Sequence, residues 1–270
     1  MLKIEVRHAS TIPLEFFGVT PERLEELNPL EVAKLTVRYG SHAVELGEFA
    51  TVMGSGSDGS LRFAGETGRV KGIGAGSMRG SIRVEGDAGF HAGAGMSGGS
   101  LLIQGHAGDW LGAEMRGGEI EVLGDAGHNA GSAYRGSRHG MRGGSITIKG
   151  GAGDELGLLM RRGTVVVRGT VGALAGAAMI AGTIVAMKGF GARAGTGMKR
   201  GTLISCGPLD SIAPGFRNCC EYAPSYLDLF RRQSCPDLPM ADTARCYRGD
   251  VLAGGRGELL MLAATSELIS

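Results

Sequence analysis

Across residues 59–207, a short alternation of apolar and polar positions recurs at an almost constant interval. Each copy opens with a glycine and places apolar side chains two and four residues later. The opening glycines are Gly59, Gly80, Gly99, Gly118, Gly144, Gly163, Gly182 and Gly201, at intervals of 21, 19, 19, 26, 19, 19 and 19 residues. Apolar side chains at every second position indicate a strand with one buried face. The pattern therefore predicts one strand in each unit of a tandem repeat.

Glycines also recur nine and thirteen residues after most of the opening ones, and 40 of the 50 glycines lie in this segment. Glycine at a fixed position of a repeat favours a tight corner with positive φ or a close approach between neighbouring units. A unit of 19 residues cannot bury its apolar face alone, so successive units must stack. We expect an all-β fold in which residues 59–207 form a right-handed parallel β-helix.

Six methionines share one position of the repeat, three residues before the next opening glycine. They are Met96, Met115, Met141, Met160, Met179 and Met198. Methionine is a flexible filler of irregular cores, so we expect this column to lie inside the stack.

The two flanks lack the repeat and are expected to cover the ends of the stack, because open sheet ends attract further strands. Thr20-Pro21-Glu22 is typical of a helix start, and residues 34–39 and 42–52 alternate like strands. Five prolines follow Gly207, and residues 226–232 suit a short helix. The predicted division is an N-terminal α+β cap at 1–58, the glycine-rich β-helix at 59–207 and a C-terminal capping and partner-contact segment at 208–270.

Composition argues against several classes of function. A net charge of +1 and 5% aromatic residues give no reason to expect a nucleic-acid partner. No apolar run is long enough to span a membrane, and the first residues lack the apolar core of a signal peptide. All five cysteines follow residue 205, and their odd number favours reduced thiols in the cytoplasm over a disulfide framework.

No catalytic motif fits its context. Residues 93–98 spell G-x-G-x-x-G, but a predicted strand follows at Leu101 where a dinucleotide fold needs a helix. Adjacent Cys219 and Cys220 do not have the spacing of zinc ligands. We therefore expect no catalytic residue, no metal and no cofactor in this chain.

A column of cations runs beside the methionines, and we call it the basic column. It comprises Arg79, Arg116, Arg142, Arg161 with Arg162, and Lys199 with Arg200. Like charges stacked about 5 Å apart repel by roughly 1 kcal/mol even in water. The column therefore indicates either a solvated edge with splayed side chains or a binding surface for an acidic ligand or partner.

The interval of 26 residues contains seven more than the usual 19, and these are residues 134–140, the inserted loop. Tyr134, Arg135, Arg138 and His139 give it an aromatic ring and cations suited to contact with an anion or a protein. The alternative is a surface loop without a binding function.

Three positions after the opening glycine, the later units carry Val166, Val185 and Ile204, whereas the earlier ones carry Arg62, Arg83, Leu102 and Glu121. Stacking would align the three aliphatic residues into one apolar stripe. Since such stripes rarely stay in water, we expect a partner or the C-terminal segment to cover it.

The repeat, the Met-Arg-Gly-Gly corners at Met115 and Met141, and the Tyr134-Arg135-Gly136 insertion resemble the C subunit of formylmethanofuran dehydrogenase over about residues 1–265. The repeat is also similar to the C-terminal glycine-rich domain of glutamate synthase. The resemblance implies a non-catalytic subunit of a one-carbon complex whose other subunits are its partners. In methylotrophic bacteria, the related formyltransferase/hydrolase complex moves a formyl group from tetrahydromethanopterin to methylofuran and hydrolyses it to formate.

The resemblance favours the bacterial complex and leaves two alternatives open. One is a subunit of the archaeal dehydrogenase, which reduces CO2 onto methanofuran, and the other is a spacer like that of glutamate synthase. In either one-carbon complex, a methylofuran- or methanofuran-type carrier is handled by the whole assembly. Because such carriers end in polyglutamate, the resemblance makes the basic column and the inserted loop candidate binding sites for the carrier tail.

Overall fold

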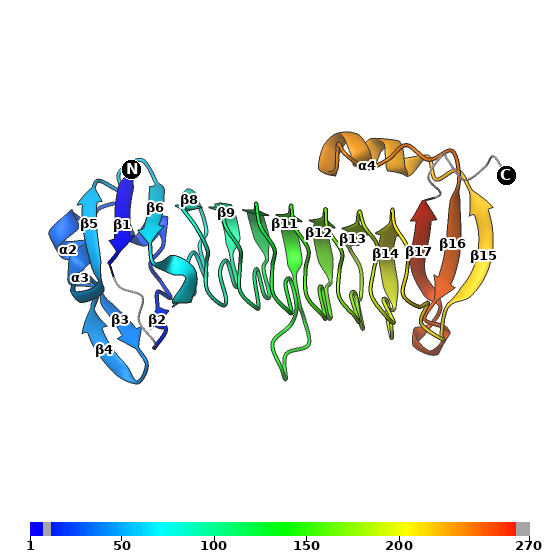
Figure 1. Ribbon diagram of the computed structural model, residues 1–270, viewed down its shortest axis with the longest axis horizontal. Helices are drawn as coiled ribbons and strands as arrows, with labels where there is room; N and C mark the ends of the chain where they lie inside the picture. Colours follow the sequence, from blue (N-terminus) through cyan, green and yellow to red (C-terminus); the bar gives the residue numbers. More distant parts are fainter. Residues whose placement is uncertain (8–11, 263–270) are drawn as a thin grey trace.

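The computed structural model describes residues 1–7 and 12–262, which form an elongated, predominantly β structure (Figure 1). Each repeat unit contributes one strand to a long sheet. These strands are β6 (Ser60–Gly65), β8 (Ser81–Val84), β9 (Ser97–Ile103), β10 (Gly117–Val122), β11 (Arg142–Ile148), β12 (Arg162–Val167), β13 (Thr183–Ala186) and β14 (Arg200–Ser205). They pair in parallel in this order, which confirms the expected all-β class.

Equivalent side chains stack from unit to unit inside the fold. Leu101, Ile120 and Ile146 are register partners on β9, β10 and β11, and each is at most 2% exposed. The six methionines of the column are all fully buried, as predicted. A second column of parallel bridges lines another side of each unit, from Ala88 through Ala107 and Ala126 to Leu209.

The two fixed glycine positions have different causes. Glycines thirteen residues into each unit adopt positive φ, as Gly93 does at 64°, so they are required by the backbone turn. Glycines nine residues in are required by close approach, because a Cβ on Gly89 would lie 2.6 Å from the carbonyl oxygen of Val70 in the preceding unit. The repeat therefore needs glycine for conformation at one corner and for space at another.

Side chains also link successive units along the stack. The Asp87 carboxylate accepts the backbone N–H of His106 at 2.7 Å, and His106 Nδ1 accepts that of Asp125 at 3.0 Å. Asp125 in turn accepts the N–H of Gly151 at 2.7 Å. Each side chain thus satisfies a backbone donor of the next unit.

The N-terminal segment extends the long sheet and adds a smaller one. β1 (Leu2–Val6) pairs in parallel with β6 and antiparallel with β5 (Ala50–Gly54). The smaller sheet has the order β4-β3-β2-β7. Its strands are β4 (His42–Glu45), β3 (Thr36–Tyr39), β2 (Leu14–Glu15) and β7 (Val70–Lys71).

The helix expected after Thr20 is α1 (Pro21–Leu24), and a second, α2 (Pro29–Ala33), was not predicted. The continuous strand predicted over 42–52 is wrong, because α3 (Leu46–Phe49) interrupts it. The Glu48 carboxylate caps the start of this turn by accepting the Glu45 N–H at 3.1 Å, and Leu46 is fully buried.

The C-terminal segment adds three further strands to the end of the long sheet beyond β14. β17 (Arg256–Leu262) pairs in parallel with β14, and β16 (Ala244–Gly249) and β15 (Arg217–Tyr222) follow antiparallel. The helix expected over 226–232 is α4 (Tyr226–Ser234), which lies along the outer face of the sheet (Figure 1). Residues 263–270 of the predicted capping segment lie outside the described residues.

Candidate functional site

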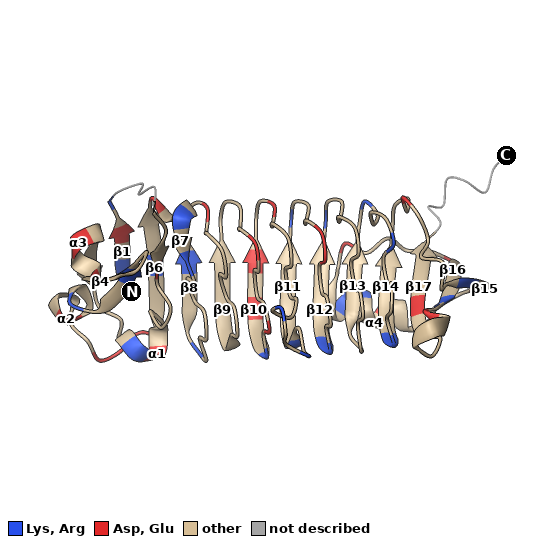
Figure 2. Ribbon diagram, turned by 90° about the horizontal axis from the view of Figure 1, so that it is seen from below, with Lys and Arg blue, Asp and Glu red and all other residues tan. Residues whose placement is uncertain are grey.

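The basic column lies where the chain enters the strands, at the corner occupied by the methionines. The backbone N–H groups of Arg116 and Arg161 donate to the carbonyl oxygens of Met96 and Met141 in the preceding units, at 2.7 and 2.8 Å. Lys199 makes the same bond to Met179 at 2.7 Å. Lys and Arg residues gather along this edge of the stack, near the beginnings of β10, β11, β12 and β14 (Figure 2).

One unit interrupts the column. The equivalent N–H bond between the Arg161 and Lys199 levels belongs to Ile180, which donates to Met160 at 2.8 Å. Arg116, Arg142 and Arg161 therefore follow one another in consecutive units, and Lys199 lies two units beyond Arg161. These three arginines lie at the starts of β10, β11 and β12.

These cations are not neutralised within the described part of the chain, where no ion pair involves Arg116, Arg142, Arg161 or Lys199. Arg116, Arg161 and Lys199 are exposed, while Arg142 is half-buried and its Nε has no hydrogen-bond partner. Arg79, the member of the column nearest the N-terminus, is paired with Glu25. The rest of the column is thus free to contact an external anion.

The inserted loop is anchored at both ends. The Tyr134 ring stacks on Trp110 with centroids 5.0 Å apart, and its hydroxyl lies 2.9 Å from Nδ1 of His91. At the other end, Nε2 of His139 lies 3.3 Å from Nη1 of Arg161, a member of the basic column. Arg135 and Arg138, between the two anchors, are exposed. The loop thus joins an aromatic surface to the basic column.

Burial favours the neutral forms of Tyr134 and His91. It raises the pKa of Tyr134 to about 12, with a further contribution from the charge of Glu114. Burial also lowers the pKa of His91, and the nearby Lys71 acts in the same direction. A neutral phenol can donate and a neutral imidazole nitrogen can accept, so the pair is suited to a hydrogen bond at neutral pH.

The apolar stripe is covered by the chain itself. Val166, Val185 and Ile204 are at most 3% exposed and pack in one cluster with Leu227 of α4 and Leu238. Arg168, the residue that follows β12, forms an ion pair with Asp237. This pair holds the segment after α4 against the sheet. The structure therefore places the C-terminal segment on these residues.

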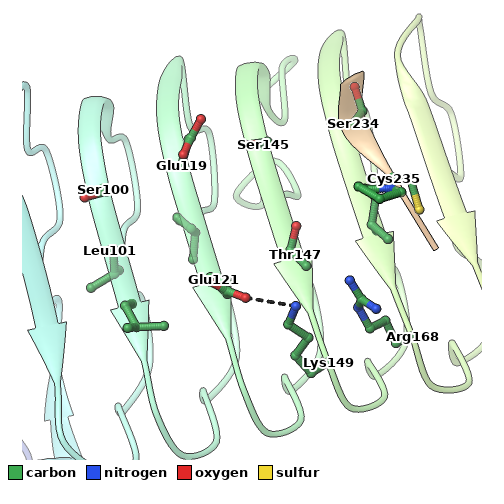
Figure 3. A pocket seen from close by; sticks show the side chains of 14 residues that line it. Ser100, Leu101, Glu119, Glu121, Ser145, Thr147, Lys149, Arg168, Ser234 and Cys235 are labelled. Atoms are coloured by element: carbon green, nitrogen blue, oxygen red, sulfur yellow. Dashed lines mark ion pairs between the residues drawn. The ribbon is translucent and has the colours of Figure 1, made fainter. Parts of the chain in front are cut away.

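Next to α4, the outer face of the sheet remains open and forms a groove that the sequence did not indicate. A cavity of about 400 Å³ is lined by residues in and just after β9 to β12, by the end of α4 and by the chain that follows α4 (Figure 3). Glu121 and Lys149 form an ion pair of 3.0 Å across this face. The sequence showed only that the residue three positions after the opening glycine changes from polar Glu121 and Thr147 to Val166, which marks where the covered part of the sheet begins.

Within the described ranges, no group of His, Cys, Asp and Glu side chains is arranged to hold a metal ion. None of the helices described is both long and apolar enough to cross a membrane.

No family model matches the sequence. The C subunit of molybdenum-containing formylmethanofuran dehydrogenase 1 from Methanosarcina barkeri is 38% identical over 89 residues, 32% of this chain. The C subunit of the formyltransferase/hydrolase complex Fhc from Methylorubrum extorquens is 39% identical over 76 residues, 28% of this chain. The matched segments span 30% and 28% of the length of these curated relatives.

A solved structure extends the similarity to 97% of the chain. One chain in the crystal structure of the formyltransferase/hydrolase complex FhcABCD from Methylorubrum extorquens, in complex with methylofuran, superposes with a TM-score of 0.88. It is 35% identical, and the match covers 97% of this chain and 100% of that one. The chain is a repeat protein built from stacked units with glycine at their corners. Within that class, the chain belongs to the family formed by the C subunits of formylmethanofuran dehydrogenase and of the formyltransferase/hydrolase complex.

Proposed function

We propose that this chain is the non-catalytic structural subunit of a cytoplasmic formyltransferase/hydrolase complex. The complex would transfer a formyl group from tetrahydromethanopterin to methylofuran and hydrolyse it to formate. The similarity over 97% of the chain to a protein of such a complex carries this proposal. In this function the chain offers surfaces to the other subunits and to the carrier, and the chemistry takes place in those subunits.

We infer that residues 59–207 form a right-handed parallel β-helix between the terminal segments 1–58 and 208–270. Two columns of parallel pairing support this inference, one along the strands and one along the bridges from Ala88 to Leu209. Such a stack is stiff because every unit bonds to both neighbours. A stiff body is suited to holding other subunits in a fixed arrangement.

Affinity purification of the tagged chain from its native cells tests the proposed function. We expect the remaining subunits to co-purify in fixed proportion, and the assembly to transfer formyl groups to methylofuran. The isolated chain should not catalyse this transfer. Recovery of the chain alone, or turnover by the chain freed of its partners, would refute the proposal. Co-purification of molybdenum- or tungsten-containing subunits would instead favour the dehydrogenase, to which the Methanosarcina barkeri relative belongs by name.

The basic column is proposed to hold the polyglutamate tail of the carrier. Each contact of Arg116, Arg161 or Lys199 would be exposed to solvent and contribute only about 0.2–1 kcal/mol. Several such contacts together retain a flexible chain of carboxylates and still allow it to slide. Binding should weaken strongly as salt concentration rises.

Charge reversal at two adjacent levels, Arg142→Glu with Arg161→Glu, tests this function of the column. We expect an intact complex whose KM rises several-fold for carriers with long tails and stays unchanged for a carrier truncated to one glutamate. Lys188→Glu is the matched control, since this exposed lysine lies elsewhere on the stack. Loss of assembly would show that the column docks an acidic subunit. Unchanged assembly and kinetics would leave it as a solvated edge.

A further inference from the structure

Five rings gather on one side of the stack, in a chain with few aromatic residues, and we call them the aromatic patch. The patch comprises Phe17, Phe90, His91, Trp110 and Tyr134. His91 is central, with its ring centroid 6.2 Å from that of Phe17, 6.4 Å from Phe90 and 5.6 Å from Tyr134. The rings come from the N-terminal segment, from two repeat units and from the inserted loop.

Much of this patch faces solvent. Phe17 and Phe90 are 49% and 46% exposed, and the other three rings are only half-buried. Beneath Trp110 and Tyr134 lie the small buried side chains of Ala75, Ala94 and Ala113. The rings therefore rest on the surface of the stack and are not part of its main core.

The fold does not require aromatic rings here. His91 and Trp110 occupy the same position in consecutive units and have φ of 64° and 65°, a region that bulky residues rarely adopt. Later units also have positive φ at this position, and they carry Asn129, Glu155, Leu174 and Arg193. Because other residue types meet the same backbone demand, the rings at 91 and 110 need another explanation.

We propose that the aromatic patch docks a neighbouring subunit of the complex, through an apolar protrusion of that subunit flanked by carboxylates. This inference rests on the proposed function. Exposed clusters of Trp, Tyr and Phe bordered by Arg are typical of the centres of protein interfaces. The patch extends over four segments of the chain, an area that suits a protein surface better than a single small ring.

The charge around the patch indicates the chemistry of the partner. The acids beside the patch are held by the chain itself, since Asp109 accepts the N–H of His128 at 2.8 Å and Glu114 accepts that of Tyr134 at 3.3 Å. At His91, the charges of Glu15 and Asp109 oppose that of Lys71. Arg135 and Arg138 extend from the patch, are exposed, and form no ion pair in the described structure. Carboxylates on the docking subunit would complement them and speed association.

The test measures assembly of a double variant, Phe17→Glu with Phe90→Glu, with the other subunits of the co-purified complex. Because both rings are about half exposed, the isolated variant should unfold at the wild-type temperature. Its dissociation constant for the remaining subunits should rise by about 30-fold or more. The control, Leu30→Glu with Leu123→Glu, makes the same kind of change at side chains 77% and 45% exposed and should assemble as wild type.

A second readout uses the single tryptophan of the chain. Incorporation of 5-fluorotryptophan places one ¹⁹F nucleus at Trp110, and its resonance should shift when unlabelled partner subunits are added. Arg135→Glu with Arg138→Glu should slow association and reduce its salt dependence.

Wild-type affinity of the Phe17/Phe90 variant, together with an unmoved ¹⁹F resonance, would overturn the docking proposal. Normal assembly with lost methylofuran binding would also overturn it, and would assign the patch to the carrier. The wild-type chain serves as reference in each measurement. If it assembles normally while the variants show no defect, the proposed function stands and only the docking site fails.

Discussion

Replacement of Val166 and Val185 by aspartate is expected to detach α4 and lower the free energy of unfolding by about 4 kcal/mol or more. Both valines are almost completely buried beneath the C-terminal segment, at 3% and 0% exposure. Two carboxylates there would lose their hydration, and the nearby Arg168 is already paired with Asp237. Thermal unfolding and the rate of proteolysis within residues 223–241 measure the effect.

The matched control is Leu102→Asp, at the same position of the repeat in a unit that α4 does not cover. Leu102 is only half-buried and borders the open groove, so the new carboxylate stays hydrated. We expect the control to change stability by less than about 1 kcal/mol. Equal unfolding temperatures for the two variants would mean that the contact with α4 contributes little to stability.

Gly118→Ala should also destabilise the protein strongly, by about 2–5 kcal/mol. Gly118 has a φ of 86°, and its added Cβ would lie 2.8 Å from backbone atoms of Gly98 and Gly99 in the preceding unit. The positive φ costs about 1–2 kcal/mol for alanine, and the remainder comes from forcing β9 and β10 apart. Chemical denaturation of the two proteins measures the difference.

Gly136→Ala separates these two contributions. Gly136 has the same φ of 86°, but a Cβ there meets no atom within 4 Å. Its substitution should cost only the torsional part, about 1–2 kcal/mol. If the two alanine variants were equally stable, close approach between units would not be the reason for the opening glycines.

The strands of the repeat could be predicted because one physical requirement is restated in every unit. Leu61, Ile82 and Leu101 occupy the same buried position of successive units. The strand predicted in one unit is therefore supported by the same pattern in the next. The methionine column and the positive-φ glycines follow the same logic. Repetition converts weak local preferences into a strong signal.

The C-terminal strands lacked this support, although one of them carries the repeat motif. Gly257-Glu258-Leu259-Leu260-Met261 has apolar residues two and four positions after glycine, and it pairs with β14 beginning at Arg200. The motif lies 56 residues after Gly201, far outside the regular interval. Nothing in the local sequence shows that a chain leaving the stack will return to the same sheet.

The candidate site was visible in the sequence only in part. The inserted loop stood out as an irregular interval, but the stacking of Tyr134 on Trp110 joins residues 24 positions apart, and no periodic signal connects them. The interruption of the basic column at Ile180 could have been read from the register of the units. The groove beside α4 could not be predicted, because the C-terminal segment forms one of its walls and the sequence does not show where that segment packs.

The parallel register of β6 to β14 also makes the separation between the two ends of the molecule adjustable in discrete steps. Every unit offers the same bonds to the unit before it and to the unit after it. Gain or loss of one whole unit by gene duplication or deletion would therefore leave both end segments with suitable neighbours. It would change the span between them by one strand spacing, about 4.8 Å. The distance between the two end segments can thus change in evolution by one strand spacing at a time, while the end segments themselves stay the same.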